Sequence, residues 1–187
     1  MDFKIPIACI SIIFSITSCS SIRELKKNAG EGVMYGMVYN GENVPVSNAE
    51  VFVDEKSITQ TDTQGRFILI SKQHKEFALS IVKSGYETIA GKFQFEPMDV
   101  IHLVMLNAEQ LVHRAENAMT EGRYHDVIIF CDRALVLNLD RIDAIYLKAL
   151  GLVRLREYGR ARTILEELQD IIGEREYIRL VLEGLPK

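Results

Sequence analysis

The sequence predicts an α+β protein of two domains, in which a seven-stranded antiparallel β-sandwich is followed by two helical hairpins and a capping helix. Residues 33–106 alternate short β-branched and aromatic stretches with turn residues and lack a sustained helical period. Residues 107–187 carry apolar and small residues that recur at an offset of 34, which indicates repeated helical hairpins. A chain of 187 residues is long enough for two small domains.

The composition fits a folded protein and argues against nucleic-acid binding. Hydrophobic residues make up 48% of the chain and charged residues 26%, which is typical of globular domains. The formal net charge is -4, so no overall basic field gathers phosphates. We therefore expect no nucleic-acid partner.

An apolar run near the N-terminus predicts a signal peptide over residues 1–18. As a helix, residues 5–16, "IPIACISIIFSI", would span about 18 Å, well short of a hydrocarbon core of about 30 Å. That length fits the hydrophobic region of a signal peptide better than a transmembrane helix.

Residues 16–19, Ile-Thr-Ser-Cys, resemble the bacterial lipobox, with isoleucine in place of the usual leucine. The resemblance implies that Cys19 is acylated on sulfur, becomes the first mature residue and fixes the protein to a membrane. Residues 19–32 would then be a tether, and Ser20 implies sorting to the outer membrane, on either of its faces. The alternatives are an ordinary signal peptide cut near Ser18 and a buried N-terminal helix.

The strands of the sandwich are expected between turn sequences such as "NGEN" and "TDTQG". Ala49, Val51 and Val53 share one face by the two-residue period and should point into the core. In "RFILI", residues 66–70, both faces are apolar, which predicts an interior strand. The expected ranges are 33–39, 49–54, 57–61, 66–71, 77–83, 88–95 and 100–106.

Four motifs in residues 33–106 resemble, in order and spacing, the carboxypeptidase regulatory-like, or transthyretin-like, β-sandwich, which shares the Ig-like layout. They are "GMV" at 36–38, "VPVSNAEVFV" at 44–53, "TDTQGRF" at 61–67 and "SGYE" at 84–87. This resemblance implies an accessory module without catalytic residues.

The residue types in these motifs suit turns. Pro45 fixes φ at the start of a strand, Asp62 can accept a hydrogen bond from the backbone two residues on, and Gly65 can adopt a positive φ. Asp62 is also a candidate calcium ligand, but a hard cation needs several converging oxygens and only Asp54 and Glu55 lie near it in sequence. The turn-forming role is preferred.

The helical part divides into residues 108–141, residues 142–172 and a closing helix over 173–185. Its 34-residue period and its small residues at helix crossings resemble the tetratricopeptide repeat. Each such hairpin buries one face alone, and stacking completes the core. Because about three repeats are usually needed for stability, we expect the sandwich, a partner or a second copy of the chain to cover the remaining surface.

The repeat resemblance implies a concave groove, lined by the first helix of each repeat, that holds an extended peptide or a helix of another protein. The positions that would line it are Glu109, Val112, Glu116, Met119 and Thr120 from the first unit and Asp143, Tyr146, Leu150, Val153 and Arg154 from the second.

No pattern in the sequence predicts an enzyme, a metal site or a cofactor. The chain lacks a G-x-S-x-G elbow, an H-E-x-x-H helix and a P-loop. Cys131 lies in the apolar run "VIIFC" and is interpreted as a core residue. The dispersed histidines have no metal-ligand spacing and are His74, His102, His113 and His125.

Arginines cluster around the second repeat's turn, in "VRLREYGRAR". They could bind an anion, but a solvated face neutralised by neighbouring glutamates is the preferred interpretation, because exposed ion pairs are common. The members of this cluster are Arg154, Arg156, Arg160 and Arg162.

The sequence therefore predicts a non-catalytic, lipid-anchored bacterial envelope protein that binds a protein partner, expected to be an envelope component, through its repeats. The alternative is an adhesin-like module that binds envelope polysaccharide or a host ligand through the sandwich loops. In that alternative the stacking platforms would be Tyr35, Tyr39, Phe93 or Phe95.

Overall fold

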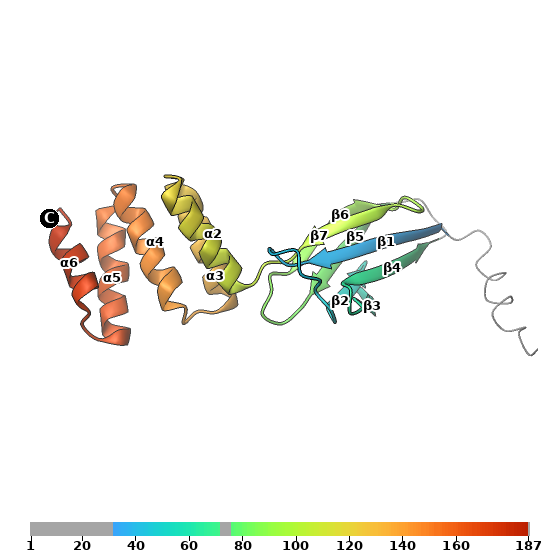
Figure 1. Cartoon of the computed structure of the whole chain (residues 1–187), viewed down its shortest axis with the longest axis horizontal. Coiled ribbons are helices and arrows are strands. Elements are labelled where there is room, and N and C mark those ends of the chain that lie inside the picture. The colour runs from blue at the N-terminus through green and yellow to red at the C-terminus, as the bar shows by residue number, and fades with distance from the viewer. Residues whose placement is uncertain (1–31, 72–75, 187) are drawn as a thin grey trace, which may run out of the picture.

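A computed structural model describes residues 32–71 and 76–186. Two β-sheets are followed by five helices, so the protein is α+β. Figure 1 shows the strands at one end of an elongated molecule and the helices side by side at the other. The predicted signal peptide, the predicted lipidation site Cys19 and nearly all of the predicted tether lie outside the described residues.

Each strand begins and ends within two residues of its predicted range. The sheets have three strands, in the order β4-β1-β7, and four strands, in the order β3-β2-β5-β6. The strands are β1 (Gly32–Tyr39), β2 (Glu50–Val53), β3 (Lys56–Gln60), β4 (Arg66–Ser71), β5 (Glu76–Val82), β6 (Ile89–Gln94) and β7 (Val100–Val104).

One strand pair corrects the prediction of an antiparallel sandwich. Strands β1 and β7 run parallel, with Tyr35 opposite Val100 and Tyr39 opposite Val104. Parallel neighbours need a long connection, and here five strands of the chain separate the two. The other described pairs are antiparallel.

The position of β4 corrects a second prediction. The apolar run of residues 66–70 predicted an interior strand, but β4 lies at the edge of the three-stranded sheet. Phe67 and Leu69 point into the core, whereas Ile68 is 49% exposed and Ile70 is 54% exposed. The prediction failed because exposed apolar side chains are common, so an apolar residue does not by itself imply burial.

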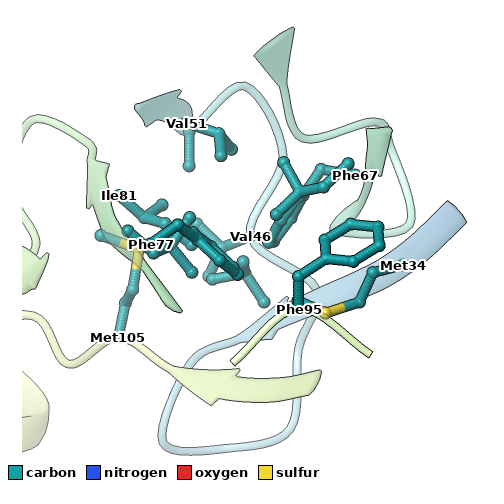
Figure 2. Packing of buried hydrophobic residues seen from close by; sticks show 12 residues of the cluster. Met34, Val46, Val51, Phe67, Phe77, Ile81, Phe95 and Met105 are labelled. Atoms are coloured by element: carbon teal, nitrogen blue, oxygen red, sulfur yellow. The ribbon is translucent and has the colours of Figure 1, made fainter. Parts of the chain in front are cut away.

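The sandwich core lies between the two sheets, as Figure 2 shows. Ala49 and Val51 are fully buried as predicted, and Val53 is half-buried against the core. Gly36 lets β1 approach Phe67, because a Cβ at this position would lie 2.0 Å from the phenylalanine ring. Large core residues include Met34, Val46, Val51, Phe67, Phe77, Ile81, Phe95 and Met105.

The turn before β4 confirms the predicted role of Asp62. Its carboxylate accepts hydrogen bonds from the backbone N–H groups of Gln64 and Arg66, each at 2.8 Å. Gly65 closes the turn with φ of 71°. The hydrogen bond from the Arg66 backbone is the main cause that holds the pKa of Asp62 below its ordinary value.

The helices repeat with one spacing. Helices α2 (Ala108–Thr120), α4 (Ile142–Arg154) and α6 (Glu176–Gly184) begin 34 residues apart, and so do α3 (Tyr124–Leu137) and α5 (Tyr158–Ile172). The small residues predicted at helix crossings are fully buried; they are Ala115, Ala134, Ala149 and Ala161. The closing helix α6 therefore occupies the same place in the repeat as α2 and α4.

Helix α2 begins at a capping box. The side chain of Asn107 accepts a hydrogen bond from the Gln110 N–H at 2.8 Å, and the Gln110 side chain accepts one from the Asn107 N–H at 3.4 Å. Within the described part of the chain, no helix combines the length and apolar character that crossing a membrane requires.

The two halves meet at a narrow contact. Glu87 of the sandwich pairs with Arg133 of α3, and the Glu87 N–H donates a hydrogen bond to the Leu106 carbonyl at 2.8 Å. The Gly41 N–H donates to the Gln110 side chain at 3.3 Å. The sandwich core and the core of the first hairpin are separate clusters, so the halves do not share one core.

Candidate binding groove

The first helix of each unit supplies the candidate groove. Helices α2, α4 and α6 are equivalent by the 34-residue step and lie along the stack in chain order (Figure 1). Equivalent positions therefore recur along the stack: Asp143 corresponds to Tyr177, and Tyr146 corresponds to Leu180. A ligand that lies across the helices would meet one member of each set in turn.

The structure distributes the predicted groove residues over neighbouring hollows. One hollow, of about 580 Å³, lies between α2, the start of α4 and the loop after β1, and it is lined by Glu109, Val112, Glu116 and Asp143. A second, of about 340 Å³, lies between α4 and α6 and is lined by Met119, Leu150, Val153 and Arg154. Tyr146 lines a third, shallow depression, which Asp143 shares with the first hollow.

Val112 forms the floor of the first hollow and is not an accessible anchor. Its side chain is only 5% exposed and belongs to the core of the first hairpin. Gln110, which is also buried, lines the same hollow and carries the hydrogen bond to Gly41. The loop after β1 thus forms one wall at this end of the groove.

The first hollow is polar, and several of its charges are paired within the protein. The Arg141 guanidinium binds the Asp143 carboxylate through two hydrogen bonds, of 3.0 and 2.5 Å. These bonds are the main cause that holds the pKa of Asp143 below its ordinary value. His113 Nδ1 lies 3.1 Å from Glu116 Oε2.

Aromatic and aliphatic side chains dominate the other end of the groove. Tyr146 and Tyr177 form an edge-to-face pair with centroids 5.0 Å apart, a favourable geometry for aromatic rings. Burial raises the pKa of Tyr146 above its ordinary value. Beside them Leu180 is exposed, and Val181 lines the hollow with Leu150 and Val153.

Tyr177 and Leu180 are groove residues that the sequence analysis missed. Residues 173–185 were expected to form a helix that only closes the stack. The signal was present, because the same 34-residue step leads from Asp143 to Tyr177 and from Tyr146 to Leu180.

The arginine cluster does not converge on one point. Arg154 lines the hollow between α4 and α6, whereas Arg162 lines a different hollow, beside Leu182 and Glu183. Arg160 pairs with Glu157 at 2.5 Å. No shared anion site results from these arginines.

The described residues offer little reactive chemistry. Among residues 32–71 and 76–186, no group of three histidine, cysteine, aspartate or glutamate side chains could hold a metal ion. Cys131 is fully buried as predicted, and burial raises its pKa to about 12, so little thiolate exists at neutral pH. Phe95, a candidate stacking platform in the alternative prediction, is only 3% exposed because it packs in the sandwich core.

Comparison with known proteins identifies no family. No family model matches the chain, and no curated protein matches it. Among solved structures, similarity is found to the Bacillus anthracis TIE protein, with TM-score 0.36, 15% identity and 42% of this chain covered. A Streptococcal ancillary pilin gives the same three values. The 3-chlorocatechol 1,2-dioxygenase of Rhodococcus opacus 1CP has TM-score 0.33 and 11% identity, with 41% of this chain covered.

The matches span 17%, 30% and 59% of the lengths of those three chains, in the same order. At such TM-scores, the similarities decide nothing about the function of this chain.

Proposed function

We propose that this protein is a lipid-anchored component of a bacterial envelope that binds another protein in the groove of α2, α4 and α6. Binding involves no chemical reaction. The observation that carries the proposal is the 34-residue step, which repeats along the stack and places Leu180 at the position of Tyr146 and Tyr177 at the position of Asp143. In this view the helices are tetratricopeptide repeats and the strands are a carboxypeptidase regulatory-like sandwich that acts as a spacer.

The groove favours a ligand with two different ends. Polar and charged side chains line the end at α2, so polar or charged groups of a ligand find hydrogen-bond partners there. Apolar side chains line the hollow between α4 and α6. Each large apolar side chain that a partner buries there contributes roughly 1.5–3 kcal/mol before entropic costs. A peptide segment with an apolar half and a polar half therefore fits best.

The position of the N-terminal strand supports an anchored orientation. Strand β1 begins at the end of the molecule farthest from α6 (Figure 1). An acylated Cys19 would hold the sandwich next to the outer membrane, at the end of the molecule opposite α6. Several acyl chains on one residue make such anchoring stable.

The groove is tested by recovering partners of the anchored protein after mild crosslinking. Tyr146→Ala and Arg154→Glu should each reduce the recovered partner several-fold, because both side chains line the groove. The matched controls are Val136→Ala, at an exposed residue of α3, and Arg160→Glu, at an exposed residue of α5. If all four variants keep the partner and changes to the sandwich loops remove it, the groove is not the binding site.

The anchor is tested separately by labelling cells with a fatty-acid analogue. The wild-type protein should carry the label and partition with membranes, and Cys19→Ala should do neither. An unlabelled wild-type protein would overturn the anchoring half of the proposal and leave the groove untouched.

A further inference from the structure

The outward side of the three-stranded sheet is an apolar surface, which we name the outer sheet face. It consists of the side chains that alternate away from the core on β4, β1 and β7. Its polar groups are the side chains of Arg66 and His102 and the hydroxyls of its two tyrosines, and Arg66 pairs with the Asp62 carboxylate at 3.0 Å. Its residues are Val33, Tyr35, Met37, Tyr39, Arg66, Ile68, Ile70, Val100, His102 and Val104.

Tyr35 lies at the centre of this face. It is opposite Ile68 on one side and Val100 on the other, and all three side chains are exposed. Toward the end of β1 on the same face, Tyr39 and His102 stack with ring centroids 6.5 Å apart. The apolar side chains therefore form a continuous surface across three strands.

Exposed apolar side chains lie at both ends of this surface: Val104 is at the end of β1, and Ile70 is near its start. Ile70 is opposite Val33, the second residue of β1. Met98, which is 74% exposed, is held at the same end by a hydrogen bond of 2.6 Å from its N–H to the Val33 carbonyl. Ile70 and Met98 therefore extend the exposed apolar surface at the start of β1.

The dimensions of the face argue against a second copy as its partner. Three strands about 4.8 Å apart, with a rise of about 3.3 Å per residue over residues 33–39 of β1, give the face a flat projected area of roughly 330 Å². A stable protein–protein interface needs about 800 Å² on each partner. The face is too small to hold a dimer together by itself.

A lipid bilayer is a partner that such a small apolar surface can contact. Only 12 residues separate Cys19 from Gly32, which limits the reach of the tether to about 40 Å. An anchored protein meets the bilayer at high local concentration, so a small apolar surface is sufficient for contact. Tyrosine suits the membrane interface because it has an apolar ring and a polar hydroxyl.

We propose that the outer sheet face docks on the bilayer that holds the lipid anchor. This inference rests on the proposed acylation of Cys19. Docking fixes the sandwich flat against the membrane and limits the directions in which the groove points.

The chain contains no tryptophan, so a single introduced tryptophan reports its own surroundings. The probe is Ile68→Trp in the full-length acylated protein, reconstituted into phosphatidylcholine vesicles with brominated acyl chains. Its fluorescence should move to shorter wavelength and fall at least twofold relative to vesicles without bromine. The matched control is Ala78→Trp, at an exposed position on the four-stranded sheet, and it should change little.

Val100→Trp is the second probe, in case Ile68→Trp does not fold as judged by circular dichroism. Vesicle flotation in the same samples separates the two proposals. If the protein floats but neither face probe is quenched, docking is wrong and the anchor stands. If the protein does not float, the anchor and the docking both fail. A wavelength shift that needs no vesicles and grows with protein concentration identifies a second copy as the partner and also overturns docking.

Discussion

Glu87 and Arg133 join the two halves of the chain through a bidentate ion pair. The Arg133 Nε and Nη2 atoms donate to the two Glu87 carboxylate oxygens at 2.8 and 2.7 Å. Glu87 follows the turn at Gly85, and Arg133 lies on α3. A backbone bridge between Tyr86 and Asn107 lies beside the pair. These contacts set the orientation of the helices relative to the sandwich.

Arg133→Met should weaken this connection while it keeps most of the aliphatic packing. Because both side chains are partly exposed, we expect the free energy of unfolding to fall by only about 1 kcal/mol in urea titrations. The control is Arg160→Met, which breaks an exposed pair within α5 and should cost less than about 0.5 kcal/mol. An equal fall in the free energy of unfolding in both variants would contradict a special role for the Glu87–Arg133 pair.

Gly36→Ala should destabilise the sandwich strongly. The new methyl group would overlap the Phe67 ring, which is buried in the sandwich core. Overpacking of this kind typically costs about 1–3 kcal/mol, seen as a lower thermal midpoint. Gly159→Ala on α5 is the control; nothing lies within 4 Å of its new Cβ, so helix stability should rise by roughly 0.5–1 kcal/mol. A neutral Gly36→Ala would show that β1 and Phe67 do not pack this closely.

Cys131 should be unreactive in the folded protein. Burial raises its thiol pKa from 9.0 to about 12, so the folded state keeps the proton where the unfolded state loses it. Its contribution to stability is therefore complete below about pH 9 and declines as the pH rises toward 12. In a Cys9→Ser, Cys19→Ala variant, a thiol reagent at pH 8 should label Cys131 slowly until urea is added. Fast labelling of the folded protein would show that Cys131 is accessible.

The sequence predicted the secondary structure well because local signals determine it. Turn residues such as Asp62 and Gly65 place the ends of strands, and the 34-residue period places the helices. The edge position of β4 and the parallel β1–β7 pair were not predictable in the same way. Both depend on how distant strands order in a sheet, and Ile68 and Ile70 carry no local sign that their face stays exposed.

The placement of the residues on α2, α4 and α6 that line the hollows was predictable in part, for a related reason. The repeat spacing places Tyr146 and Leu150 without any knowledge of tertiary contacts. The repeat spacing does not predict whether a side chain is accessible to a ligand. Val112 is buried because of packing between helices. Tyr177 was missed because α6 was not treated as a further unit of the repeat.

Photo-crosslinking in intact cells tests the central claim most directly. With p-benzoylphenylalanine placed at Leu180, in the groove, we expect one discrete adduct with another protein. The same group at Val136 on α3, also exposed, should give no such adduct, and Tyr146→Ala should abolish the adduct formed from Leu180. No adduct from Leu180, or the same adduct from both positions, would contradict a binding groove on α2, α4 and α6.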